Sequence, residues 1–244
     1  SYTDGQEVNN IASKGENVVL YAQWTPITYK VVFKSTLPTT NTMEPQTLTY
    51  DKAENLSQNS LTNPGYHFVG WSTEDDRYAV PAYEDEASVI NLASAQGEEV
   101  ELYALWEANE YRIVFEPNPG EGSTAVTGTT KSMNMSYSLR KTLTPVAFKR
   151  EGYDFKNWNT SPDGTGKSYV NKAGVVNLTT ENDVDVHLYA QWEPRTYKIK
   201  FNANTGSGSM ENQDLTFDKA ANLKTNGFTK ENYTFKGWST TQDG

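Results

Sequence analysis

The stretch GYHFVGW occupies residues 65–71, and near-copies of it follow as GYDFKNW at 152–158 and NYTFKGW at 232–238. Two other motifs recur in a fixed order with these heptapeptides. One is present as YKVVF (29–33), YRIVF (111–115) and YKIKF (197–201). The other is present as LYAQW (20–24), LYALW (102–106) and LYAQW (188–192). All six tryptophans of the chain lie inside these motifs, which indicates a tandem repeat.

The repeat period divides the chain into two complete units and two partial ones. Phe33 and Phe115 are 82 positions apart, and Phe115 and Phe201 are 86 apart. The predicted domains are the C-terminal part of a repeat with its last strand (1–24), a first complete repeat (25–106), a second complete repeat (107–192), and the N-terminal part of a repeat that lacks its last strand (193–244).

Each repeat is expected to contain four strands and one short helix. The YKVVF-type motifs alternate large apolar residues with others, which is typical of a half-buried strand. The residue after the second strand is a favoured helix N-cap in every repeat: Asp51, Ser138 and Asp218. Residues 51–54 also match a capping box that ends at Glu54. The sequence therefore predicts an α+β fold, with tandem β-grasp-like repeats (β-β-α-β-β) of roughly 80 residues in an extended array.

Glycine or asparagine stands at the start of the third strand and again just before its tryptophan. These two residue types best tolerate a left-handed backbone. We expect positive φ at both places, with a turn into the strand at the first and a β-bulge at the second that turns the tryptophan toward the core. The predicted turn and bulge residues are Gly65, Gly70, Gly152, Asn157, Asn232 and Gly237.

The apolar positions of the strand motifs predict the core, because alternate residues of a strand share one face of the sheet. The predicted structural core consists of Phe33, Phe68, Trp71, Leu102, Trp106, Phe115, Phe155, Trp158, Leu188, Trp192, Phe201, Phe235 and Trp238. A leucine follows the aromatic residue at the end of each second strand by six positions, and we expect it to face the sheet from the predicted helix. These leucines are Leu56, Leu143 and Leu223. A platform of aromatic rings that binds a sugar is the weaker interpretation, since the rings keep to the inner face.

The composition argues against several classes of function. A net charge of -10 disfavours binding to nucleic acid or anionic membranes, both of which attract clustered Lys and Arg. The absence of cysteine excludes disulfides and thiolate metal sites. His67 and His187 lie in different repeats, and the acidic run 84–86 lacks EF-hand spacing. We therefore predict no catalytic, cofactor-binding or metal site, no membrane insertion in this segment, and no enzyme.

The motif set YxVxF, GYxFxGW and, about 35 residues later, LYAQW resembles the Listeria–Bacteroides repeat, which is the B-repeat of internalin B and of many bacterial surface proteins. The resemblance covers essentially the whole chain. It implies a β-grasp-like domain strung in arrays between a secretion signal and a cell-wall anchor, and it brings no catalytic residues. The middle repeat departs from the pattern through Asn157 in place of glycine and through a longer first loop, residues 116–132.

The predicted function is a non-enzymatic, extracellular, semi-rigid spacer of a bacterial surface protein, anchored to the cell wall through regions outside this chain. The linkers TPIT (25–28), EANE (107–110) and EPRT (193–196) are too short to act as flexible tethers. The alternative function is an adhesion module that binds a host protein or glycan through exposed loops such as 116–132.

The expected partners are neighbouring repeats. Residues 197–244 lack a last strand, and residues 1–24 contain one. We therefore also predict head-to-tail strand complementation between residues 1–24 of one molecule and residues 197–244 of another. In a longer array, a neighbouring repeat of the same chain would supply that strand instead.

Overall fold

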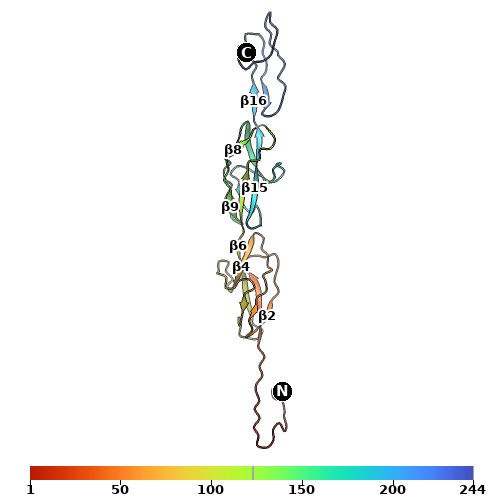
Figure 1. Ribbon diagram of the computed structural model, residues 1–244, viewed down its shortest axis with the longest axis vertical. Helices are drawn as coiled ribbons and strands as arrows, with labels where there is room; N and C mark the ends of the chain where they lie inside the picture. The colour runs from red at the N-terminus through yellow and green to blue at the C-terminus, as the bar shows by residue number, and fades with distance from the viewer. Residues whose placement is uncertain (123, 244) are drawn as a thin grey trace. The chain divides into compact units, whose positions relative to one another are not determined.

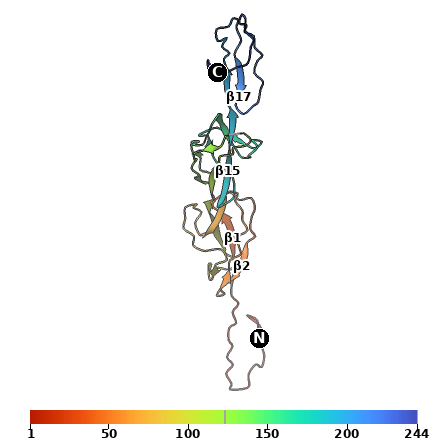
Figure 2. The ribbon, with the colours of Figure 1, turned by 45° about the horizontal axis from the view of Figure 1, so that its top comes forward.

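The computed structural model describes residues 1–122 and 124–243, and the regular secondary structure in these ranges is β-strand throughout (Figure 1, Figure 2). The chain forms two compact units. The first contains Ser1–Asn63 and Phe68–Trp106, and the second contains Pro64–His67 and Glu107–Gly244. Among the described residues, none belongs to a helix long and apolar enough to span a membrane.

The first complete repeat is built on a four-stranded mixed sheet with the strand order β2-β1-β6-β4. Its strands are β1 (Thr28–Ser35), β2 (Gln46–Thr49), β4 (Tyr66–Ser72) and β6 (Glu99–Ala108). The first strand, β1, pairs antiparallel with β2 and parallel with the last strand, β6, so that Phe33 lies opposite Leu102. A short antiparallel pair, β3 (Glu54–Asn55) and β5 (Ser88–Val89), lies outside this sheet.

The second complete repeat has the same plan in a five-stranded sheet with the order β13-β12-β15-β7-β9. Its strands are β7 (Glu110–Glu116), β9 (Met133–Ser136), β12 (Tyr153–Asn159), β13 (Ser168–Tyr169) and β15 (Val184–Pro194). The parallel pair recurs, with Phe115 opposite Leu188. Two short pairs complete the repeat: β8 (Val126–Thr127) with β11 (Lys149–Arg150), and β10 (Lys141–Thr142) with β14 (Gly174–Val175).

The chain from residue 193 to residue 243 has a smaller set of strands. β16 (Thr196–Ile199) and β17 (Gln213–Thr216) form an antiparallel pair, and a single bridge joins Ser207 to Thr229. By contrast, residues 1–26 form no strand and are exposed throughout.

The predicted helix is wrong, because the described chain contains no helix and the fold is all-β rather than α+β. The three expected N-cap residues instead adopt a left-handed backbone, with φ of 60° at Asp51, 63° at Ser138 and 55° at Asp218. Asparagine side chains hold two of these turns: the amide N–H of Asp51 donates to Asn91 Oδ1, and that of Ser138 donates to Asn177 Oδ1.

After the turns at Asp51 and Ser138 the chain continues in an extended conformation and does not form a helix. The carboxylate of Glu54, the expected partner in a capping box, accepts a hydrogen bond from the Thr49 amide at 3.1 Å. A helix of one or two turns has a costly nucleus, whereas β3 and β10 gain cross-strand hydrogen bonds with β5 and β14. Leu56 and Leu143 are nevertheless buried from this extended segment.

The third-strand motif combines a left-handed entry with a bulge. Gly65, Gly152 and Asn232 have φ of 85°, 75° and 63°. In the second repeat the register between β12 and β15 shifts between Phe155 and Asn157, which marks the bulge. The expected positive φ at the second position occurs at Gly70, but Asn157 and Gly237 do not adopt it. In a classic β-bulge the bulged residue has a backbone conformation near the right-handed helical region and still redirects the side chains that follow it. A bulge therefore does not require positive φ at the residue before the tryptophan.

The core of each complete repeat is centred on the tryptophan that follows the bulge. Trp71 and Trp158 are fully buried, and each packs on the phenylalanine of the first strand with ring centroids 4.8 Å and 4.7 Å apart. Most other predicted core residues of these repeats are buried as well: Phe33, Leu102, Trp106, Phe115 and Leu188. Phe68, Phe155 and Trp192 are half-buried, as are Phe201 and Trp238 of the third repeat, whereas Phe235 is exposed.

Replacing this tryptophan tests the packing. Trp158→Ala should lower the free energy of unfolding by about 3–5 kcal/mol, because it leaves a large cavity in a closed core. Tyr78→Ala is the control, since Tyr78 is 81% exposed and its loss should cost less than about 0.5 kcal/mol. Denaturant unfolding followed by far-UV circular dichroism measures both. Equal losses would contradict the assigned core.

Candidate functional site

The joint between the second and third repeats is a single residue, Arg195, which lies between β15 and β16. Its amide N–H donates to the carbonyl of Gly152 at 2.8 Å, and its own carbonyl accepts from the Phe217 amide at 2.9 Å. The backbone of the linker is therefore hydrogen-bonded to the repeat before it and to the repeat after it. The sequence showed that the linker is short, but it did not show these bonds.

The ring of Phe217 packs against the backbone of Gly152. A Cβ at this glycine would lie 2.3 Å from the ring, so no larger residue fits without displacing Phe217. Tyr153 meets the same ring edge-on, with centroids 5.8 Å apart, and its hydroxyl donates to Asp218 Oδ2 at 2.9 Å. Burial, and then this hydrogen bond, raises the pKa of Tyr153, while the nearby Arg150 guanidinium opposes the shift. We call the pair Gly152–Tyr153 a ring seat.

The same ring seat occurs earlier in the chain, in the segment Pro64–His67, which belongs to the second compact unit. Here a Cβ at Gly65 would lie 2.4 Å from the ring of Tyr137. Tyr66 packs edge-on against that ring at 5.5 Å, and its hydroxyl is 3.0 Å from Ser138 Oγ. Both glycines thus have a second role beyond the predicted turn: they make room for the aromatic residue of the following repeat.

The linker residue Asn109 repeats the bonding of Arg195. Its amide donates to the Gly65 carbonyl at 2.8 Å, and its carbonyl accepts from the Tyr137 amide at 2.8 Å. Its side chain is buried, with Oδ1 2.9 Å from His67 Nδ1 and Nδ2 donating to the Thr180 carbonyl at 2.7 Å. The signal that could have revealed this joint is the aromatic residue at 50, 137 and 217, which recurs in every repeat.

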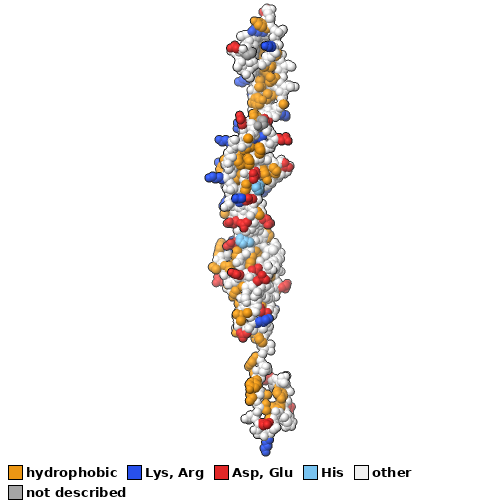
Figure 3. Space-filling view, in the orientation of Figure 1, with side chains coloured by type: hydrophobic (Ala, Val, Ile, Leu, Met, Phe, Trp, Pro, Cys, Tyr) orange, Lys and Arg blue, Asp and Glu red, His pale blue; other side chains and the backbone are white. Residues whose placement is uncertain are grey.

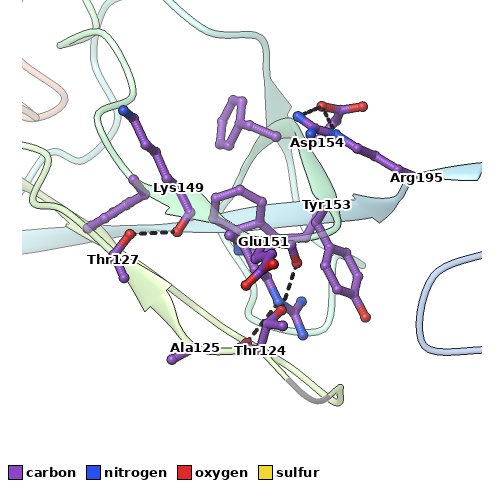
Figure 4. Close-up of a pocket in the computed structure, with 12 residues that line it drawn as sticks. Thr124, Ala125, Thr127, Lys149, Glu151, Tyr153, Asp154 and Arg195 are labelled. Carbon is purple, nitrogen blue, oxygen red and sulfur yellow. Dashed lines mark hydrogen bonds and ion pairs between the residues drawn. The ribbon is translucent and has the colours of Figure 1, made fainter.

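Thr124, Ala125 and Thr127, from the long first loop of the second repeat, line a surface crevice. Arg150 is buried and ties the loop down, because its guanidinium donates to the carbonyls of Thr124 at 3.2 Å and Glu121 at 2.9 Å. Thr124 Oγ1 in turn donates to the Glu151 carbonyl at 2.8 Å (Figure 4). Glu121 and Thr124 are therefore bonded to the strand segment that forms the rest of the crevice wall.

The crevice has a volume of about 860 Å³ and a mixed lining. Two half-buried rings, Phe155 and Trp192, line it together with the cation Lys149. At its edge Arg195 donates to Asp154 Oδ1 through Nε at 2.9 Å and through Nη2 at 2.6 Å (Figure 4). This ion pair raises the pKa of Arg195. Such a lining offers ring-stacking and charge contacts.

The two histidines of the chain have different neighbours in the structure. His67 Nδ1 lies 2.9 Å from Asn109 Oδ1, while His187 Nδ1 lies 2.8 Å from Glu116 Oε1. In the part of the chain that the structure describes, no group of three or more His, Asp or Glu side chains is arranged to hold a metal ion.

Comparison with known proteins connects this architecture to a family. The model of the Listeria–Bacteroides repeat domain matches residues 29–104, 111–191 and 197–244. Two curated proteins of Evansella cellulosilytica are similar over 94% of this chain: a "Putative Gly-rich membrane protein" at 28% identity and a "Putative membrane protein" at 27% identity. The chain spans 24% and 31% of their lengths. No solved structure matches it. Three family matches that together cover most of the chain show that it belongs to the Listeria–Bacteroides repeat family.

Proposed function

We propose that this chain is a non-enzymatic, extracellular repeat region that acts as a semi-rigid spacer, or stalk, of a bacterial surface protein. The observation that carries the proposal is the bonded linker, in which Arg195 and Asn109 each make two backbone hydrogen bonds beside a ring seat. A linker held in this way has little freedom to act as a hinge, so successive repeats add length in a defined direction.

The comparisons support the location. Both relatives are named as membrane proteins, and each is more than three times as long as this chain. We propose that the chain is one segment of such a surface protein, held at the cell wall through regions outside the segment. Its function is then geometric: it projects whatever domain lies further from the cell.

Distance measurements across the second linker test the spacer function. The chain has no cysteine, so Lys131→Cys and Lys236→Cys, both at exposed positions, place one spin label in each of the two repeats. We expect a narrow distance distribution from double electron–electron resonance. Gly152→Ala should broaden it, because the new methyl group displaces Phe217 from the ring seat.

Alanine at a positive φ strains the backbone even where there is room for its methyl group. Gly97→Ala is the control that introduces this strain without a clash. Gly97 has φ of 74°, close to the 75° of Gly152, but a Cβ there meets nothing within 4 Å. The control should leave the distance distribution narrow. A broad distribution in the unmodified sequence would mean a flexible tether and would overturn the spacer function.

A second candidate function is adhesion through the crevice beside loop 116–132. The combination of Phe155, Trp192 and Lys149 favours an acidic sugar, which stacks on rings and pairs with a cation. This candidate predicts that the chain binds immobilised hyaluronan. Lys149→Ala should weaken the binding at least about fivefold, whereas the control Lys236→Ala, in the third repeat, should leave it unchanged. Surface plasmon resonance measures both. Absence of binding, or equal effects of the two substitutions, would count against adhesion through this crevice to such a sugar.

A further inference from the structure

We propose that the second complete repeat withstands tensile force through the parallel ladder between its first strand, β7, and its last strand, β15. The chain enters this repeat at Glu110, where β7 begins, and leaves it at Pro194, where β15 ends. The inference gives a mechanical activity to the proposed stalk, and its biological use rests on that proposed function.

The direction of the two strands decides how a pull along the chain acts on the ladder. β7 and β15 are parallel, with Val184 opposite Tyr111 at one end and Tyr189 opposite Glu116 at the other. The start of β7 and the end of β15 therefore lie at opposite ends of the ladder. A pull on these two points slides one strand along the other, so the evenly spaced hydrogen bonds of the ladder are strained together.

The ladder lies inside the sheet and is covered on its inner face. β12 pairs with β15 on one side, and β9 pairs with β7 on the other. The inward residues Ile113, Phe115 and Leu188 are buried. A backbone group that loses its partner here is shielded from water, so breaking the ladder leaves unpaired groups at high cost.

Hydrogen bonds outside the register also join the two strands where they begin. The amide of Glu110 donates to Asn182 Oδ1 at 2.9 Å, and the amide of Asp183 donates to the Glu110 carbonyl at 2.8 Å. The first repeat has the same arrangement with another side chain, because the amide of Thr28 donates to Gln96 Oε1 at 3.1 Å. Both complete repeats thus fix the entry of the first strand to the entry of the last.

The other end of the ladder is held by the indole of the last strand. Trp192 Nε1 donates to the carbonyl of Pro117 at 2.9 Å. In the first repeat, where β1 and β6 are parallel in the same way, Trp106 Nε1 donates to Ser35 Oγ at 2.8 Å. We infer that the first repeat resists tension by the same means.

Charged side chains of both signs lie on the surface shown in Figure 3, and one pair of them crosses the ladder. Arg112 and Asp185 are opposite each other in the register, and the guanidinium donates through Nε at 2.8 Å and through Nη2 at 2.5 Å. This hydrogen bonding lowers the pKa of Asp185. Because an exposed ion pair contributes little, the resistance must come mainly from the backbone ladder.

Pulling the repeat in two directions tests the proposal in the full chain, which has no cysteine of its own. Glu110→Cys with Glu193→Cys places handles at opposite ends of the ladder, whereas Glu110→Cys with Glu181→Cys places both at the same end. All three positions are exposed. Optical tweezers at one pulling speed should give an unfolding force at least about twofold higher for the first pair, because the second pair opens the ladder one bond at a time.

The two variants share one ladder and one core, so each is the control for the other. Equal forces in the two directions would overturn the proposal. With the first pair, the segment 110–193 should lengthen in one step, by roughly 3.5 Å for each residue released less the folded distance. Gradual lengthening before that step would also contradict it. Neither handle pair includes the linker at Arg195, so failure here would count against the ladder and not against the spacer function.

Discussion

The parallel pairing of the last strand with the first is the contact on which each repeat depends. It joins segments about 70 residues apart in sequence, as in the Phe33–Leu102 and Phe115–Leu188 pairs, and it closes the sheet over the buried tryptophan. In the described residues 197–243, which include no such strand, the same phenylalanine–tryptophan contact forms but stays partly exposed. The ring geometry is thus local to the first strand and the bulge motif, while burial comes from the last strand.

The same last strand also sets up the linker. β15 ends one residue before β16 begins, so the chain enters the third repeat without a loop, and Arg195 is bonded on both sides. The ring seat adds a packing contact that glycine alone permits at this distance. At Asn232 the left-handed φ is kept but a Cβ is present, so an aromatic ring could not approach as closely as Phe217 approaches Gly152. Asn232 therefore keeps the left-handed turn found at Gly152 but leaves no room for an aromatic ring against the backbone.

Much of the fold is predictable because its signals are local and repeated. Alternation in YKVVF and LYALW predicts strands, the fixed motif order predicts repeats, and glycine or asparagine at 65, 152 and 232 predicts left-handed turns. The helix prediction failed because aspartate is suited both to an N-cap and to a left-handed turn, and Asp51 and Asp218 adopt the turn. At Asp51 the turn is bonded to a residue distant in sequence, Asn91, which a local pattern does not reveal. The ring seats and the role of Arg150 depend on contacts between separate segments, which periodicity alone does not reveal.

Hydrogen–deuterium exchange at single amides, on dilute protein, tests the central claim that the linker is part of one continuous bonded structure. The amides of Arg195 and Phe217 donate to Gly152 and to Arg195, and we predict that they exchange as slowly as the amides within β15. Exchange of these two amides at the rate of the exposed residues 1–24 would show that the repeats are joined by a free tether, and the account of a semi-rigid spacer would fail.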